Sequence, residues 1–134
     1  MVSPPFEAIA SDREIGALVH DFYGRARADA TLGPIFEKHV KDWDRHFLLL
    51  ADFWSSVLNT SGRYKGQPMI AHMRLPELEE HHFAHWLSMF ETSAEATLNP
   101  KAAAVAKFKA ARIAQSMRLG LRQLLGKSIL EPLD

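Results

Sequence analysis

Four of the seven histidines lie within one short stretch, MIAHMRLPELEEHHFAHW, which runs from Met69 to Trp86. Histidine is the commonest metal ligand among neutral side chains, so this stretch raises the question of a metal site. His81 and His85 are spaced i, i+4 on a predicted helix and could together chelate a metal. No HExxH arrangement supplies a general base, however, and both positions fall on the polar face of that helix. We therefore expect His81 and His85 to face water, and the pattern assigns no role to His82.

The remaining histidine of this stretch, His72, stands alone in a short element. Pro68 and Pro76 bracket this element and leave room for about two helical turns. A lone histidine is more often structural or exposed than a ligand. A short element held at both ends nevertheless presents one side chain rigidly, and an axial metal ligand requires that rigidity. The pattern alone leaves both interpretations of His72 open.

Tyr23, His46 and Trp86 are polar side chains on helical stripes that should otherwise be buried and apolar. A buried polar group without a partner costs roughly 1 to 3 kcal/mol. The three side chains either satisfy one another and the backbone as ordinary core residues, or form a polar spot in an apolar pocket. The second arrangement would suit a small polar ligand.

Length and composition exclude several classes of function. The 134 residues predict one domain over 1–134, with an N-terminal arm at 1–10 and a C-terminal tail at 125–134. Sixteen basic residues balance sixteen acidic ones, so we expect neither nucleic acid nor an anionic membrane as a partner. The absence of cysteine leaves histidines and carboxylates as the only strong metal ligands. No signal peptide or long apolar run is evident, which predicts a cytoplasmic protein.

Helical periodicity covers most of the chain and predicts an all-α fold. The first long helix should begin at the capping-box sequence Ser11–Asp12–Arg13–Glu14. A turn with about one helical turn is predicted over 29–36, where Gly33–Pro34 is a helix breaker. Further helices are predicted over about 42–58, in the short element 69–75, from 76 onward, and from Asn99–Pro100 onward.

Five stretches of the chain resemble the truncated haemoglobins, specifically the third group of that family. They are FYGRARADATLGPIF, DWDRHFLLLADFWSSVL, RYKGQPMIAHMRLP, FAHWLSMFE and ARIAQSM, which occur in family order between Ile15 and Leu121. The chain has no Gly-Gly pair, a departure from the other two groups that fits the third. The resemblance implies a two-over-two helical sandwich around haem b.

The same resemblance implies roles for individual residues. His72 of IAHMRLP matches the proximal histidine that binds the haem iron. Tyr23, His46 and Trp86 match the distal residues that face a bound ligand. The expected haem-wall residues, for which plain core packing is an equal explanation, are Phe22, Phe36, Leu50, Phe53, Phe83, Ile113 and Met117. The candidates for contact with the haem propionates are Tyr64, Lys65 and Arg74.

The resemblance implies a haem protein that binds oxygen reversibly and releases it slowly. Tyr23 and Trp86 would donate hydrogen bonds to a diatomic ligand that gains negative charge, whereas His46 could bond the ligand, act as a gate, or coordinate iron. One alternative is a haem oxidoreductase, either a nitric oxide dioxygenase or a peroxidase-like enzyme. Its electrons would come from an external reductase, because the sequence contains no flavin or nicotinamide domain. The remaining alternative is a haem-free helical interaction module.

Overall fold

The computed structural model describes residues 8–65 and 79–124. Within these ranges the chain forms five helices: α1 (Asp12–Ala28), α2 (Gly33–His39), α3 (Trp43–Asn59), α5 (Glu80–Thr97) and α6 (Pro100–Leu124). The two described ranges contain no strand, and the predicted all-α class is confirmed. None of the helices in these ranges combines the length and the apolar character needed to cross a membrane.

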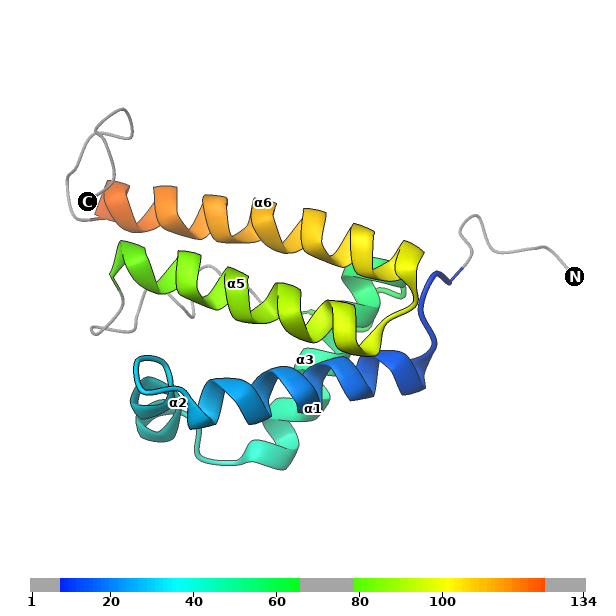
Figure 1. Cartoon of the computed structure of the whole chain (residues 1–134), viewed down its shortest axis with the longest axis horizontal. Coiled ribbons are helices and arrows are strands. Elements are labelled where there is room, and N and C mark those ends of the chain that lie inside the picture. The colour runs from blue at the N-terminus through cyan, green and yellow to red at the C-terminus, as the bar shows by residue number, and fades with distance from the viewer. Residues whose placement is uncertain (1–7, 66–78, 125–134) are drawn as a thin grey trace, which may run out of the picture.

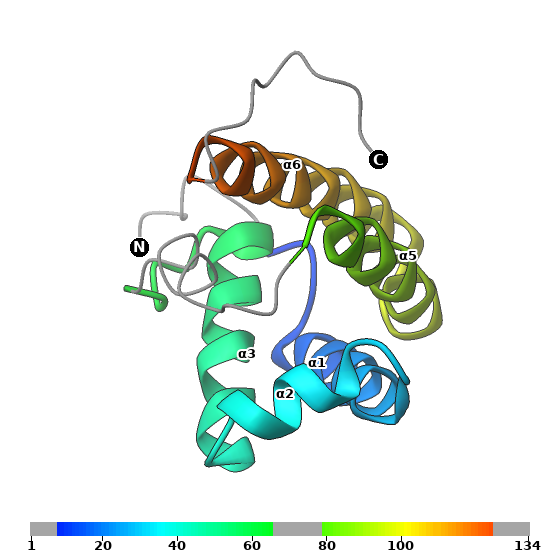
Figure 2. The ribbon, with the colours of Figure 1, turned by 90° about the vertical axis from the view of Figure 1, so that its left-hand side faces the viewer.

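The helices form two layers. Helices α5 and α6 lie side by side and antiparallel, while α3 crosses behind α1 (Figure 1). Figure 2 shows α1, α2 and α3 together on one side of the molecule and the α5–α6 pair on the other. Contacts of α1 with α5, and of α3 with α6, join the two layers. This is the two-over-two arrangement that the sequence led us to expect.

The start of α1 is fixed by the predicted capping box. The Ser11 hydroxyl accepts from the Glu14 backbone N–H at 3.0 Å, and the Glu14 carboxylate accepts from the Ser11 N–H at 3.0 Å. The same carboxylate also accepts from the backbone N–H of Asn99 at 2.8 Å and from its side-chain amide at 3.0 Å. Asn99 in turn caps α6, since its side-chain oxygen accepts from the Ala102 N–H at 3.0 Å. One carboxylate therefore joins the first helix to the last.

The segment between α1 and α3 contains more helix than predicted. Gly33–Pro34 starts α2 and does not break it, because a proline in the first turn has no N–H to leave unsatisfied. Asp29 directs this start: its Oδ2 accepts from the backbone N–H groups of Thr31 at 2.9 Å and Leu32 at 2.8 Å. Glycine is required at position 33, since a Cβ atom there would lie 2.6 Å from the Arg27 carbonyl oxygen. The predicted turn over 29–36 is therefore corrected to a tight corner followed by a seven-residue helix.

The core depends on small residues in α6 and on stacked aromatic rings. Ala102, Ala106 and Ala110 are fully buried and, having small side chains, allow α6 to pack closely on its neighbours. Across the two layers, the Trp54 ring of α3 stacks on the Phe90 ring of α5, with centroids 4.5 Å apart. The buried side chains of α1 complete this core, among them Ile15, Leu18, Val19, Phe22 and Ala26.

Replacing Glu14 with Gln should destabilise the fold and reduce its sensitivity to acid. Hydrogen bonds from the backbone of Ser11 and then of Asn99 hold the pKa of Glu14 below its ordinary value of 4.5. The stability that Glu14 contributes is fully present above that value and is lost as the pH falls through the lower folded pKa. We expect Glu14→Gln to lower the free energy of unfolding by about 1 kcal/mol near neutral pH, measured by denaturant titration.

The acid dependence separates this role of Glu14 from a general effect of lost charge. Between about pH 5 and pH 3 the wild-type protein should lose more stability than Glu14→Gln, because only the wild type has this carboxylate to protonate. Glu91→Gln, which removes an exposed carboxylate from α5, should behave like the wild type. Parallel acid curves for Glu14→Gln and the wild type would contradict the assignment.

Candidate functional site

A cavity of about 550 Å³ opens among the described helices, with lining residues from all five of them. This volume lies within the range of small-molecule and cofactor sites. All seven residues expected at the haem wall line it, namely Phe22, Phe36, Leu50, Phe53, Phe83, Ile113 and Met117. Further apolar residues complete the wall: Leu32, Ile35, Val40, Leu49, Trp54 and Ala114. The cavity is therefore mainly apolar, with a few polar groups on its surface.

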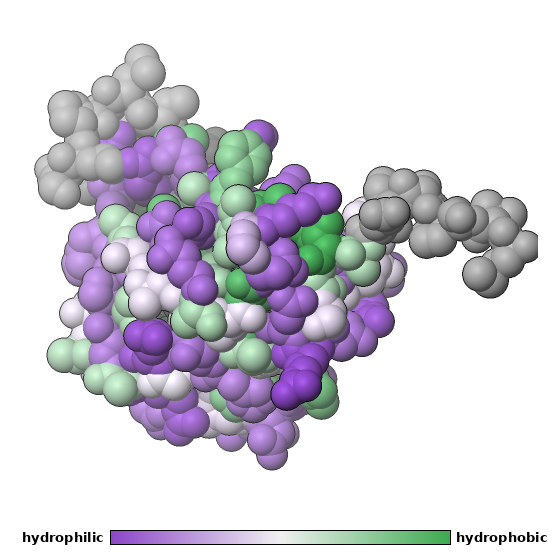
Figure 3. All heavy atoms as spheres, turned by 45° about the vertical axis from the view of Figure 1, so that its right-hand side comes forward, coloured by the Kyte–Doolittle hydropathy of each residue, from purple (hydrophilic) through white to green (hydrophobic). Residues whose placement is uncertain are grey.

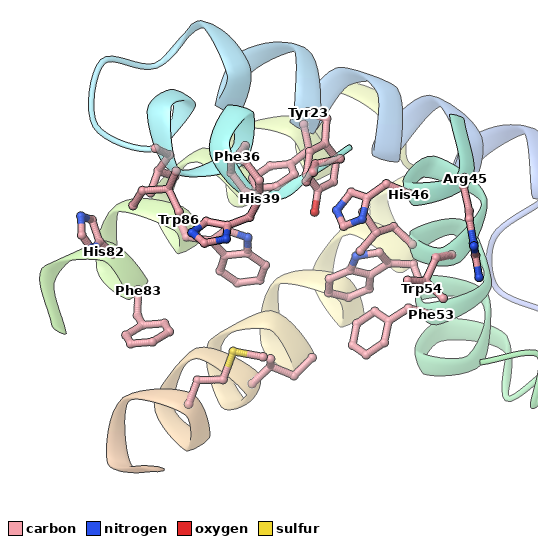
Figure 4. A pocket seen from close by; sticks show the side chains of 18 of the residues that line it. Tyr23, Phe36, His39, Arg45, His46, Phe53, Trp54, His82, Phe83 and Trp86 are labelled. Atoms are coloured by element: carbon pink, nitrogen blue, oxygen red, sulfur yellow. The ribbon is translucent and has the colours of Figure 1, made fainter. Parts of the chain in front are cut away.

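Tyr23, His46 and Trp86 line this same cavity from three different helices, α1, α3 and α5 (Figure 4). The rings of Tyr23 and His46 meet edge to face, with centroids 5.4 Å apart. Only 7% of Tyr23 is exposed, and Figure 4 shows its hydroxyl directed into the cavity. Among the described residues this hydroxyl has no hydrogen-bond partner. The structure thus brings together the three polar residues singled out by helical phase and leaves a buried donor pointing into open space.

Burial also fixes the protonation state of Tyr23. Removal of the phenol from water raises the pKa of Tyr23 far above its usual value, because the charged form is the one that loses hydration. The hydroxyl therefore keeps its proton over the whole ordinary pH range. It offers a hydrogen bond to whatever occupies the cavity.

The rings of Tyr23 and Trp86 are held in position by other aromatic rings. Phe36 and Phe22 contact Tyr23 edge to face, with centroid distances of 5.3 and 5.0 Å. The Trp86 ring stacks on Phe90 at 5.4 Å, and Phe90 stacks on Trp54 in turn. These contacts leave little freedom to either ring, so both donors are positioned before any ligand arrives.

Charged and polar residues that the sequence reasoning missed lie along one side of the cavity. His39, Lys41, Asp42 and Arg45 line it where α2 ends and α3 begins. Their position follows from the extra turn of α2, which was not predicted. The signal in the sequence was the HVKDWDRH stretch, in which polar residues crowd around His46.

His85 points outward, as expected, but it is paired with a carboxylate that the sequence did not indicate. Its Nε2 lies 2.9 Å from Asp29 Oδ1, where the ring N–H donates to the carboxylate, and its side chain is 40% exposed. The other oxygen of Asp29 accepts from the backbone N–H groups of Thr31 and Leu32 just before α2, so this carboxylate joins α5 to the corner between α1 and α2. Hydrogen bonds from Leu32 and then from His85 lower the pKa of Asp29. Helical phase gave the correct outward direction for His85 but could not show that Asp29 lies opposite.

His82 has a structural role that its pattern did not suggest. It is buried and lines the cavity, and its Nδ1 accepts from the Glu79 N–H at 2.9 Å at the start of α5. Burial, and then the neighbouring His81, lower the pKa of His82 and so favour the neutral ring that accepts this bond. His81 itself is exposed, as expected. Over 8–65 and 79–124, no three histidines or carboxylates are grouped so that they could hold a metal ion.

The expected axial ligand, His72, is not among the residues that the structure describes. His72 and Arg74, together with the short element predicted over 69–75, are outside the described residues. Of the other propionate candidates, Tyr64 lines the cavity and meets Phe53 edge to face at 5.1 Å. Lys65 is exposed and is not among the lining residues.

The lining residues fit a flat apolar cofactor with a polar ligand on one face. Aromatic and aliphatic side chains from α3, α5 and α6 provide apolar walls of the kind that a porphyrin ring requires. The Tyr23 hydroxyl, which has no hydrogen-bond partner among the described residues, can donate to an acceptor held in the cavity. A haem carrying a diatomic ligand would meet both requirements.

Comparisons with known proteins agree with this chemistry. The family model of the bacterial-like globins matches residues 5–118. The group 3 truncated hemoglobin ctb of Campylobacter jejuni is 35% identical over 98 residues, which are 70% of this chain and 76% of that protein. The crystal structure of group III truncated hemoglobin from Campylobacter jejuni matches with a TM-score of 0.77 and 32% identity, over 83% of this chain and 91% of that one. The chain therefore belongs to the bacterial-like globin family, as a group III truncated haemoglobin, and shares the haem-binding character of the globins.

Proposed function

We propose that this chain is a haem b protein that binds oxygen and other diatomic ligands reversibly and releases oxygen slowly. One observation carries the proposal: a buried Tyr23 hydroxyl is directed into an apolar cavity that His46 and Trp86 also line. A donor that would otherwise remain unsatisfied is best explained by an acceptor bound in the cavity.

In this proposal each group of residues has a separate task. His72 binds the haem iron, and the seven apolar wall residues named above enclose the ring. Tyr64, Lys65 and Arg74 are proposed to bind the propionates. When bound, the haem supplies an iron atom with an open or weakly occupied position for a diatomic ligand.

Slow oxygen release follows from the distal donors. Tyr23 and Trp86 donate hydrogen bonds to a ligand that gains negative charge, and such charge-assisted bonds are about twice as strong as neutral ones. Phe22 meets Trp86 edge to face at 5.8 Å and also contacts Tyr23, so both donors share one support. His46, whose ring meets that of Tyr23, is the third candidate and bonds the ligand, gates the cavity or coordinates iron.

The second candidate function is oxidoreductase activity toward nitric oxide or peroxide. The presence of His39, His46 and Tyr23 in one cavity favours it for peroxide, because reduction of peroxide to water consumes protons as well as electrons. With nitric oxide, bound oxygen would instead be transferred to give nitrate, which needs one electron for each turnover and no proton. Retention of oxygen also suits chemistry on the ligand better than simple delivery. The electrons would come from an external reductase.

Replacing His72 with Ala should abolish stable haem binding. We expect the variant to lose its Soret band after gel filtration of protein reconstituted with haem, because no axial ligand then anchors the iron. His81→Ala, which removes an exposed histidine from α5, should retain haem. An unchanged ferrous spectrum in His72→Ala would identify a different axial ligand. A wild-type protein that stays colourless with added haem would overturn the whole proposal in favour of a haem-free interaction module.

Replacing Tyr23 with Phe should speed oxygen dissociation by roughly tenfold or more, since a charge-assisted hydrogen bond is removed while the ring remains. Stopped-flow displacement of oxygen by carbon monoxide measures this rate. Thr92→Val, which removes an exposed hydroxyl from α5 outside the cavity, is the control and should leave the rate unchanged. Because burial keeps Tyr23 protonated, the wild-type rate should also stay constant between about pH 7 and pH 10. An unaltered rate in Tyr23→Phe would remove this hydroxyl from the mechanism.

Oxygenated protein should consume nitric oxide rapidly in a stopped-flow experiment and form nitrate. Each turnover requires one electron, so we expect a single turnover without a reductase and continued consumption once a reductase and nicotinamide cofactor are added. Free haem at the same concentration provides the baseline. Consumption no faster than this baseline would restrict the function to reversible binding.

A further inference from the structure

Charge is segregated between the two helices of the second layer. Helix α6 carries six lysine and arginine residues and no carboxylate, whereas α5 carries three glutamates and no lysine or arginine. The whole chain is neutral, with sixteen residues of each sign, so the basic character of α6 reflects the distribution of charge and not an overall excess. A helix of this composition produces a local positive field on the surface.

Packing against α5 neutralises only part of this charge. Lys107 is paired with Glu95 at 2.8 Å, and Arg122 is paired with Glu80. Lys101, Lys109 and Arg112 are exposed and have no carboxylate within ion-pair distance among the described residues. The uncompensated cations therefore lie on the side of α6 that faces away from the fold.

An exposed aromatic ring lies among these cations. Phe108 is 59% exposed, and the Arg112 guanidinium lies 5.7 Å from its ring centroid. Lys101, Ala104, Phe108 and Arg112 are spaced i, i+3, i+7 and i+11, so they share one stripe of the helix, with Lys109 at its edge. We name these five residues the outer face of α6. Along the upper edge of Figure 3, which α6 forms, apolar side chains protrude among hydrophilic ones.

We propose that the outer face of α6 docks an acidic electron-transfer protein, an inference that rests on the oxidoreductase part of the proposed function. A ring of cations around one exposed aromatic residue complements a partner with carboxylates around an apolar centre. The opposite side of α6 carries Ile113 and Met117, which line the cavity. A protein docked on the outer face is thus separated from the cavity by about one helix diameter, on the order of 10 Å.

Two other occupants fit this face less well. A second copy of the chain related by a two-fold axis would place the cations of one outer face against those of the other. An anionic membrane requires a broad apolar face to insert, but the apolar face of α6 is already buried in the fold and leaves outside chiefly Phe108 with small alanines. A water-soluble acidic partner satisfies both the charges and the single aromatic residue.

Reduced flavodoxin, a small acidic FMN protein, is the probe for this proposal. We compare its rate of reduction of the ferric haem protein by anaerobic stopped flow in the wild type and in Lys109→Glu/Arg112→Glu. The double variant should be slower by about tenfold or more at low ionic strength, and high salt should remove the difference. Phe108→Ala should be slower at every ionic strength, because it removes an apolar contact. Arg25→Glu, a reversal of an exposed charge in the last turn of α1, is the control and should match the wild type.

Direct reduction by dithionite separates failure of the docking surface from failure of the proposed function. If dithionite reduces every variant normally while flavodoxin shows no difference among them, the docking surface is overturned and the proposed function stands. Equal slowing by Arg25→Glu, or binding to anionic phosphatidylserine vesicles that only the double variant loses, would likewise overturn it. A protein that neither takes up haem nor turns over nitric oxide contradicts the proposed function. In that case, NMR titration of the isotope-labelled protein with flavodoxin still tests the outer face of α6 directly.

Discussion

The Tyr23 hydroxyl, directed into the cavity and without a hydrogen-bond partner among the described residues, is the constraint around which the cavity is organised. An unsatisfied polar group of this kind costs roughly 1 to 3 kcal/mol, and a fold keeps it only if the surroundings hold it there. Around Tyr23 they do, because rings from α1, α2 and α3 enclose the phenol on several sides. The stack of Trp86, Phe90 and Trp54, which crosses from α5 to α3, gives the Trp86 side of the cavity a comparable rigidity. Oxygen retention is thus proposed to depend on prior packing and not on movement after the ligand binds.

Sequence reasoning was most reliable where a signal is local. The reciprocal bonds of Ser11 and Glu14, and the capping of α6 by Asn99, depend on residues three positions apart and were predictable from spacing. Tyr23 and Trp86 were placed correctly by phase, because a helix fixes the direction of a side chain from its neighbours alone. The family resemblance then supplied what phase could not, namely the two-over-two fold and the expectation of a haem cofactor.

Interactions between distant parts of the chain were not predictable in this way. His85 and Asp29 are 56 positions apart, and nothing near either residue indicates the other. Helix α2 was underestimated because Gly33–Pro34 can either break a helix or begin one, and the turn that Asp29 holds before Gly33 leads into a helix. The polar residues around His39 were missed for the same reason, since their place in the cavity depends on that extra turn. The turn before α2, the contact with His85 and the position of the polar residues in the cavity wall therefore all depend on Asp29.

The double role of Asp29 has a thermodynamic consequence. The two oxygens of Asp29 serve different parts of the fold, one holding the turn at Thr31 and Leu32 before α2 and the other holding His85 of α5. Removal of this carboxylate would release the backbone of Thr31 and Leu32 and the ring of His85 at the same time. Separate substitutions would assign one free energy of unfolding to the turn before α2 and another to the contact with His85. These two values would then fail to add. The corner between α1 and α2 behaves as one cooperative unit, in which local and long-range structure are lost together.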